Sequence, residues 1–250
     1  MRGDTVARRH GRRFVKVAKR GVAWLRGATS APPGQVFMGD LRSHEPLCRE
    51  YGFNRGQPID RHYIETFLYS HRTEITGRVL EIGERLYTEK FGQDVGRSDM
   101  LHVDDHPDAT YVDDLTNGAS VPDATYDCVI LTQTLHLIFD MQAAVRTLHR
   151  VLKPGGVLLC TVPGITQIAD DDWNDTWYWS LSAAAARRLC APVFGAEQVG
   201  ISQYGNLLSA TAFLHGMAAA ELQPAELGHF DQQYPVIVAI AARRAADLTK

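Results

Sequence analysis

Apolar and polar positions divide the chain into an irregular first third and a regular remainder that begins near residue 78. From there, short continuous apolar runs alternate with segments whose apolar residues recur every three or four positions, the spacings of buried strands and amphipathic helices. The pattern predicts strands over 78–83, 99–104, 109–113, 126–132, 155–162, 196–203 and 235–242. It predicts helices near 85–91, 140–152, 181–192 and 208–221. This alternation favours a doubly wound α/β fold with a mostly parallel, seven-stranded sheet.

The segments before residue 78 differ from the regular part in pattern and charge. Residues 1–38 are rich in Arg and Lys and end in a linker with Pro and Gly, which predicts a basic amphipathic arm followed by a linker. Residues 39–77 predict a cap segment with one helix, for which the Asp60 carboxylate is a suitable N-cap. The sequence therefore predicts an arm, a cap segment and an α/β domain over 78–250.

Composition narrows the class of protein. Hydrophobic residues make up 45% of the 250 residues and charged residues 22%, as in soluble globular domains. No apolar run reaches the roughly 18 residues of a spanning helix. The four cysteines are widely spaced, with no C-x-x-C pair. This spacing suits a reducing cytoplasm and argues against a metal site or a disulfide framework, so we expect a cytoplasmic protein without a metal.

The charge is distributed unevenly along the chain. Residues 1–26 carry nine Lys and Arg against one Asp, and the rest carries 17 basic and 28 acidic residues, a net charge of −11. One interpretation is an amphipathic helix that binds an anionic membrane surface, on the inner face of the membrane, or an acidic protein partner. The other is a solvated basic tail. The acidic body disfavours nucleic acid as a partner.

Acidic residues follow three successive predicted strands. Glu81 and Gly83 end the first strand, Asp104 follows Gly83 by 21 residues, and Asp114 ends the third strand. At the carboxyl edge of a parallel sheet, an acid about 20 residues after a glycine turn is placed to accept both hydroxyls of a ribose. The turn lacks the second and third glycines of G-x-G-x-x-G, which disfavours an NAD-linked dehydrogenase.

The chain resembles the core of the class I S-adenosylmethionine-dependent methyltransferases, which have a Rossmann-like fold. The resemblance rests on Asp104 and Asp114 and on the motifs at Val79–Gly83, Val121–Ile130 and Leu148–Gly156. A later stretch, Asp175–Ser180, resembles one found in a subgroup of these enzymes that often occurs with glycosyltransferases, although Tyr178 stands where that stretch has arginine.

The resemblance implies S-adenosylmethionine as the cofactor and gives roles to residues at the first two strand ends. Glu81 and Gly83 would shape the methionine side of the site, with Glu81 acting through water on the amino group. Asp104 would hold the ribose, and the adjacent Asp105 is the alternative.

Two further strand ends complete the cofactor site that the resemblance implies. Asp114 and Leu115 would bind the adenine, through a carboxylate and an apolar platform. Thr132 and Gln133, at the end of the fourth strand, would reach the methionine moiety or the reactive methyl group.

A hydroxyl acceptor benefits from a base, and His136 is the first candidate because it lies just past Gln133. Asp171, Asp172 and His102 are the other candidates. The competing interpretation is that His136 starts a helix and only packs or caps there.

Aromatic residues are densest at Trp173, Trp177, Tyr178 and Trp179. The resemblance and this cluster favour a sugar-binding wall or a lid formed by Trp177, Tyr178 and Trp179, although some of these rings are expected in the core. The apolar stretch from Gly205 to Leu222 is longer than a simple connection requires, and it would cover the site or form a homodimer surface.

The sequence therefore predicts an S-adenosylmethionine-dependent methyltransferase that methylates oxygen on a carbohydrate acceptor: a sugar, a glycan or a glycosylated small molecule. The alternative is a weak or inactive methyltransferase-like binding module that docks on a membrane or on a glycosyltransferase. The reduced glycine turn keeps this alternative open.

Overall fold

The computed structural model describes residues 39–170 and 173–246. The chain forms two compact units, Met1–His44 and Glu45–Lys250. In the first, the described part holds one short 3₁₀ helix, η1 (Gly39–Leu41). The arm predicted over residues 1–26 lies outside the described residues. In the second unit, the described ranges contain no helix with the length and apolarity that crossing a membrane requires.

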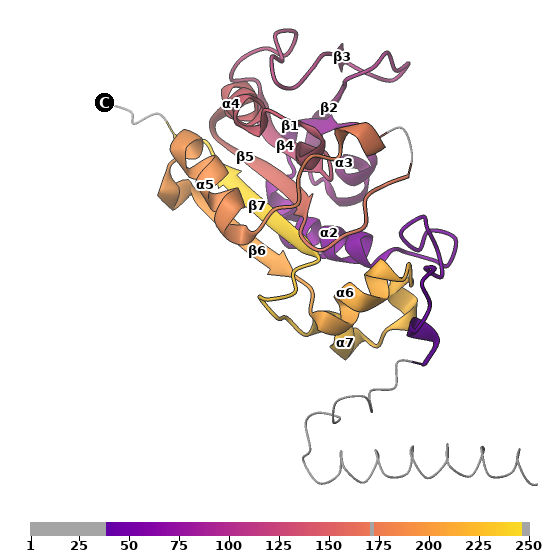
Figure 1. Ribbon diagram of the computed structural model, residues 1–250. Helices are drawn as coiled ribbons and strands as arrows, with labels where there is room; N and C mark the ends of the chain where they lie inside the picture. Colours follow the sequence, from indigo (N-terminus) through magenta and orange to yellow (C-terminus); the bar gives the residue numbers. More distant parts are fainter. Residues whose placement is uncertain (1–38, 171–172, 247–250) are drawn as a thin grey trace, which may run out of the picture. The chain divides into compact units, whose positions relative to one another are not determined.

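A seven-stranded sheet forms the centre of the second unit (Figure 1). Its strands in chain order are β1 (Gly77–Ile82), β2 (Val95–His102), β3 (Tyr111–Val112), β4 (Tyr126–Thr132), β5 (Leu152–Pro163), β6 (Val199–Tyr204) and β7 (Ile237–Arg243). The spatial order is β3-β2-β1-β4-β5-β7-β6, and only β7 runs antiparallel to its neighbours. The predicted α/β class and mostly parallel seven-stranded sheet are therefore confirmed.

Helices cover both faces of the sheet, which explains the continuous apolar runs in β4, β5 and β7. The α-helices are α2 (Ile59–Ser70), α3 (Leu86–Phe91), α4 (Met141–Val151), α5 (Ala183–Phe194), α6 (Leu207–Leu214) and α7 (Pro224–Gly228). The remaining 3₁₀ turns are η2 (Arg72–Glu74), η3 (Leu135–Leu137), η4 (Asn174–Thr176), η5 (Ala196–Gln198) and η6 (Ala219–Glu221).

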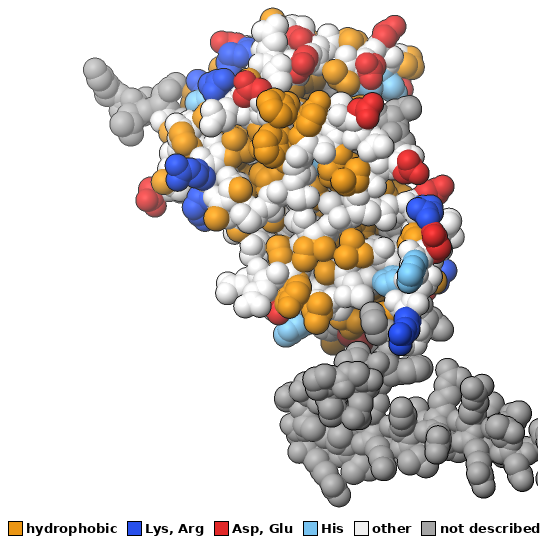
Figure 2. All heavy atoms as spheres, viewed as in Figure 1, with side chains coloured by type: hydrophobic (Ala, Val, Ile, Leu, Met, Phe, Trp, Pro, Cys, Tyr) orange, Lys and Arg blue, Asp and Glu red, His pale blue; other side chains and the backbone are white. Residues whose placement is uncertain are grey.

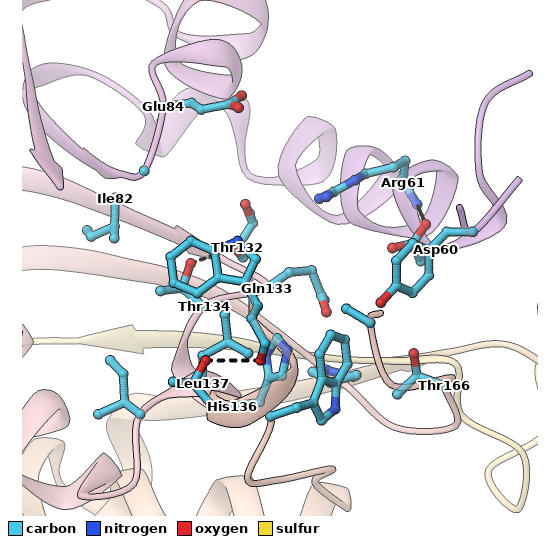
Figure 3. Close-up of a pocket in the computed structure, with 18 of the residues that line it drawn as sticks. Asp60, Arg61, Ile82, Glu84, Thr132, Gln133, Thr134, His136, Leu137 and Thr166 are labelled. Atoms are coloured by element: carbon cyan, nitrogen blue, oxygen red, sulfur yellow. Dashed lines mark hydrogen bonds between the residues drawn. The ribbon is translucent and has the colours of Figure 1, made fainter. Parts of the chain in front are cut away.

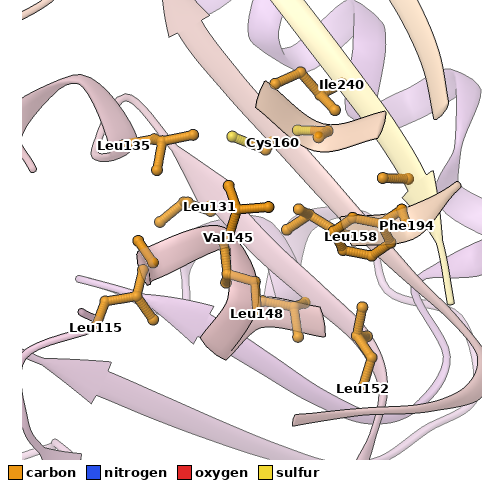
Figure 4. Close-up of a cluster of buried hydrophobic side chains, with 14 of the residues drawn as sticks. Leu115, Leu131, Leu135, Val145, Leu148, Leu152, Leu158, Cys160, Phe194 and Ile240 are labelled. Atoms are coloured by element: carbon orange, nitrogen blue, oxygen red, sulfur yellow. The ribbon is translucent and has the colours of Figure 1, made fainter. Parts of the chain in front are cut away.

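The core has one apolar cluster on each face. On one face, α4 and α5 pack on β4 and β5, with Val145 and Phe194 buried against Leu131 and Leu158 (Figure 4). On the other face, α2 and α6 bring Phe67 and other apolar residues onto the same strands. Because α2 belongs to this second cluster, the predicted cap segment is largely part of the compact unit from Glu45 onward.

Three predicted boundaries are wrong in detail. Asp60 is not the N-cap of α2, since Pro58 holds that position and Asp60 lies inside the helix. β2 ends at His102 rather than at 104, so Asp104 lies in the following bend. The helix predicted over 208–221 stops at Leu214, because Gly216 has φ +69 and a Cβ there would lie 2.0 Å from the Cys48 oxygen.

The strand order places a topological switch point between β1 and β4. Connections from β1 run outward to β2 and β3, and the chain then returns to place β4 on the other side of β1. In open α/β sheets, ligands bind in the crevice that this reversal creates at the carboxyl ends of the strands. The loops after Ile82 and after Thr132 therefore flank the expected site.

Candidate active site

A cleft of about 1410 Å³ opens at this edge of the sheet. Ligand pockets usually measure about 300–1,000 Å³, so the cleft has room for a cofactor and a second molecule. One end is lined by the segments that follow β1, β2 and β3, and the other by the 51–58 segment, the 163–178 segment and α6. Helix α2 extends along both, with Arg61 hydrogen-bonded to Tyr87 of α3. Residues after β4 lie between these ends (Figure 3).

Gly83 lines the cofactor end and has a backbone conformation that favours glycine, with φ +91. A Cβ built on Gly83 meets no atom within 4 Å, so the backbone here faces open space. A ligand can therefore approach the main chain closely at this turn, although the turn contains only one glycine.

Glu81 is buried and holds the next helix in place. Its Oε1 accepts a hydrogen bond from the Tyr87 backbone amide at 3.0 Å, and its Oε2 accepts from the amide and the hydroxyl of Thr88, both at 2.7 Å. Burial raises the pKa of Glu81, and these hydrogen bonds oppose the rise. The carboxylate thus fixes the start of α3 beside Gly83, a structural contribution to the shape of the turn.

The acids of the second and third strand ends lie in different places. Asp114 and Leu115 line the cleft, as does Asp113. The pKa of Asp113 is lowered, chiefly by a hydrogen bond from the Ser120 amide. Asp104 is exposed and does not line the cleft, although its amide donates to Nδ1 of His102, which does. Its assignment to the ribose stays a prediction.

Thr132 and Gln133 extend from β4 into the middle of the cleft (Figure 3). Gln133 has φ +47, a left-handed conformation that costs a residue with a side chain about 1–2 kcal/mol. Its amide donates to the Thr161 carbonyl at 2.9 Å, which ties the turn to β5. Strained backbone of this kind is concentrated at functional sites.

His136 lies in η3 and is only 1% exposed. Neither ring nitrogen has a hydrogen-bond partner, and the ring packs against Trp177 with centroids 4.4 Å apart. The Nε1 of Trp177 is also buried without a partner. Burial lowers the pKa of His136 to about 4, so the ring is neutral at physiological pH.

The aromatic residues of the 173–179 segment have different surroundings. Trp173, Trp177 and Tyr178 line the cleft, whereas Trp179 does not and packs on the exposed Phe139 with centroids 5.7 Å apart. Trp177 also stacks on Tyr51, with centroids 6.5 Å apart. On the face shown in Figure 2, hydrophobic side chains gather in the central part.

Sequence reasoning missed the polar residues that α2 contributes to the cleft. Asp60 and Arg61 both line it, and Asp60 is 8% exposed with Oδ1 accepting from the Arg61 amide at 2.7 Å (Figure 3). Burial raises the pKa of Asp60. A buried acid near a helix start has the same sequence signature as an N-cap, so the pattern could not separate the two. Asp171 and Asp172 lie outside the described residues.

The chain belongs to a methyltransferase family: residues 46–200 match the family described as "Methyltransferase domain". This match confirms the predicted methyltransferase class and, with it, S-adenosylmethionine as the cofactor of that class. Within the described residues, no group of three or more His, Cys, Asp or Glu is arranged to hold a metal ion.

Curated relatives match a short part of the chain. A ubiquinone/menaquinone biosynthesis C-methyltransferase UbiE from Pasteurella multocida is 38% identical over 65 residues, which cover 26% of this chain and 24% of that protein. The chain thus spans about a quarter of the length of the curated relatives that it matches.

Solved structures resemble the chain in fold at low sequence identity. One is a SAM-dependent methyltransferase from Archaeoglobus fulgidus, at TM-score 0.49 and 14% identity, covering 73% of this chain and 94% of that one. Another is the N-methyltransferase NodS from Bradyrhizobium japonicum, with S-adenosyl-L-homocysteine bound, at TM-score 0.48 and 14% identity, covering 82% of this chain and 94% of that one.

Proposed function

We propose that this protein transfers a methyl group from S-adenosylmethionine to a hydroxyl oxygen of a sugar, a glycan or a glycosylated small molecule. The observation that carries the proposal is the arrangement of the cleft at the switch point. Residues suited to the cofactor line one end, aromatic and polar residues line the other, and the unpartnered His136 lies between them.

The cofactor end fits a nucleoside joined to an amino acid. The exposed main chain at Gly83 allows close approach, and the cleft-lining carboxylate of Asp114 beside the apolar Leu115 suits an adenine. Thr132 and Gln133 would contact the methionine moiety. When bound, S-adenosylmethionine supplies a methyl group on a positively charged sulfur.

The chain's own contribution to the reaction is alignment, exclusion of water and transfer of a proton. His136 would accept the proton that the hydroxyl loses. A ring whose conjugate acid has a pKa of about 4 is a weak base for a free alcohol. It is adequate for an oxygen that is gaining a methyl group, because a protonated ether is a far stronger acid than an imidazolium.

The acceptor end favours a molecule with both an apolar face and hydroxyl groups. Aromatic rings supply stacking surface, and the exposed Tyr178 has an edge-to-face contact with Phe139 at 5.3 Å between centroids. Asp60 and Arg61 of α2 also line the cleft and supply hydrogen-bonding groups. Aromatic faces combined with polar groups suit the binding of carbohydrate.

Calorimetric titration with S-adenosyl-L-homocysteine tests the cofactor site. We expect binding by the wild type and a loss of affinity of about tenfold or more in Asp114→Ala, with Asp108→Ala as an exposed control. Asp104→Ala and Asp105→Ala decide which acid holds the ribose. An absence of binding at millimolar ligand would contradict the enzyme and leave the methyltransferase-like binding module.

The acceptor is tested by following the formation of S-adenosyl-L-homocysteine with a panel of methyl glycosides. Turnover that depends on one of these sugars supports the O-methylation proposal. Cofactor binding without turnover on any hydroxyl compound would contradict it and would direct the search to carbon or nitrogen acceptors.

A further inference from the structure

The floor of the cleft contains two adjacent side chains whose polar atoms have no partner. They are His136, through both ring nitrogens, and Trp177, through its indole Nε1. A buried donor or acceptor without a partner costs about 1–3 kcal/mol, so a folded protein rarely leaves two such groups side by side. Both residues line the cleft but the three nitrogens are themselves buried, so a molecule entering the cleft satisfies them once the rings turn toward it.

Backbone hydrogen bonds join the two segments that carry the pair. The His136 carbonyl accepts hydrogen bonds from the amides of Tyr178 and Trp179, both at 3.3 Å, so the 177–179 segment is fastened to η3. The Trp177 ring is stacked on Tyr51 with an interplanar angle of 13°, and it meets the His136 ring at 64°. One face of Trp177 is therefore occupied by another ring, which reduces its use as a stacking platform for a sugar.

We infer that His136 and Trp177 together bind one hydroxyl group of the acceptor, with the Trp177 N–H donating to the oxygen and His136 accepting the hydroxyl hydrogen. This inference rests on the proposed function and deepens it, because it names the group that the acceptor must present. His136 contacts the reacting group, and Trp177 is a positioning and specificity-determining residue that holds the same oxygen.

The chemistry of the two side chains selects a hydroxyl over other groups. An indole N–H only donates, and a neutral imidazole donates from one nitrogen and accepts at the other. A hydroxyl has one donor and two acceptor sites, so it pairs with the Trp177 N–H and with the acceptor nitrogen of His136 and keeps a lone pair free for the methyl group. An ammonium group offers no acceptor to Trp177. A carboxylate would place a charge beside a ring that burial keeps neutral.

NMR of the ¹⁵N-labelled indole groups tests the pair directly in the full chain, with and without an excess of S-adenosyl-L-homocysteine. The Trp177 resonance is assigned by its loss in Trp177→Phe. The probes are phenol and methyl α-D-glucopyranoside, and anisole serves as the matched probe without a hydroxyl. We expect a hydroxyl probe to shift the Trp177 N–H signal, anisole to shift it less, and His136→Phe to abolish the difference.

Kinetic measurements then show whether Trp177 positions the acceptor or only supports the fold. With any acceptor found in the glycoside panel, Trp177→Phe should raise KM by about tenfold, the value of one neutral hydrogen bond. It should leave the affinity for S-adenosyl-L-homocysteine unchanged. Tyr69→Phe is the control, since Tyr69 is exposed and does not line the cleft, and it should alter neither quantity.

The outcomes separate this inference from the proposed function. If S-adenosyl-L-homocysteine binds but neither hydroxyl probe moves the Trp177 signal, a resident water satisfies the pair and the inference is wrong while the cofactor site stands. If a probe moves the signal but S-adenosyl-L-homocysteine does not bind, the hydroxyl site stands and the methyltransferase proposal fails. An equal shift in His136→Phe would also overturn the pairing.

Discussion

Two buried polar regions at opposite ends of the same strands differ in whether their polar atoms have hydrogen-bond partners. Near the amino ends of β1 and β4, the Asp99 carboxylate accepts from Nε of Arg78 at 2.7 Å, Nε of Arg97 at 2.9 Å and the Tyr126 hydroxyl at 3.1 Å. Beyond the carboxyl ends, His136 and Trp177 have polar atoms without partners. The first region is complete within the protein, whereas the second is complete only when another molecule enters the cleft.

The contrast extends to the pKa values of the two groups. Burial acts to raise the pKa of Asp99, but the hydrogen bonds from Arg78, Arg97 and Tyr126 outweigh it and hold the pKa below its usual value. Burial alone lowers the pKa of His136. The Asp99 region therefore stabilises the fold, and the His136 region lowers stability in return for a binding surface, the trade-off expected at functional sites.

Removing Asp99 should produce the largest effect on stability. Asp99→Ala removes the carboxylate that pairs with the partly buried Arg78, and breaking a buried ion pair costs about 3–5 kcal/mol. Because Arg97 is more than half exposed and can turn to solvent, we expect about 3 kcal/mol. Urea denaturation measures this loss, and Asp108→Ala, an exposed site, should change the free energy of unfolding by less than about 0.5 kcal/mol. A loss of unfolding free energy no larger than that of Asp108→Ala would contradict the conclusion that the Asp99 region stabilises the fold.

Acid should expose the cost of burying His136. The ring has a pKa of about 4 in the folded protein and an ordinary value of 6.5 when unfolded, so the unfolded chain binds a proton that the folded chain excludes. The free energy of unfolding is therefore unaffected by this difference in pKa above pH 6.5. It falls as the pH drops from 6.5 toward 4, by about 3 kcal/mol in total. In His136→Phe, the free energy of unfolding should lose this slope, while His229→Phe, at an exposed position, should keep it.

At neutral pH, His136→Phe should stabilise the protein. Phenylalanine fills a similar volume and leaves no unsatisfied ring nitrogen, which gains about 1 kcal/mol. The same variant should lose methyl transfer yet retain its affinity for S-adenosyl-L-homocysteine. Denaturation and calorimetry on one preparation check both expectations. A destabilised His136→Phe would mean that the ring nitrogens are already satisfied in the free protein.

The fold could be predicted well from the sequence because the spacing of apolar residues follows from which positions are buried. Helices cover both faces of the sheet, so its central strands are recognisable as apolar runs. The sequence predicted the bounds of β4 as they are, and Glu81 and Asp114 both line the cleft, while their roles in binding the cofactor stay predictions. It could not show that Asp104 lies outside the cleft lining, since this depends on where β2 leaves the sheet. The contact between His136 and Trp177 joins segments 41 residues apart, and no local pattern encodes such a contact.

The smallest expected effect is that of Gly83→Ala on cofactor binding, and a second glycine, Gly155, serves to separate it from backbone strain. Gly83 has φ +91 and Gly155 has φ +82, and a Cβ built on either meets no atom within 4 Å. Gly83→Ala and Gly155→Ala should therefore lose the same stability, about 1 kcal/mol from the left-handed backbone. Only Gly83 lines the cleft, so only Gly83→Ala should weaken S-adenosyl-L-homocysteine binding, because its methyl group enters the space that the ligand needs. Equal affinities in the two variants would show that the ligand does not approach the backbone at this turn, and the cofactor end of the cleft would then have to be reassigned.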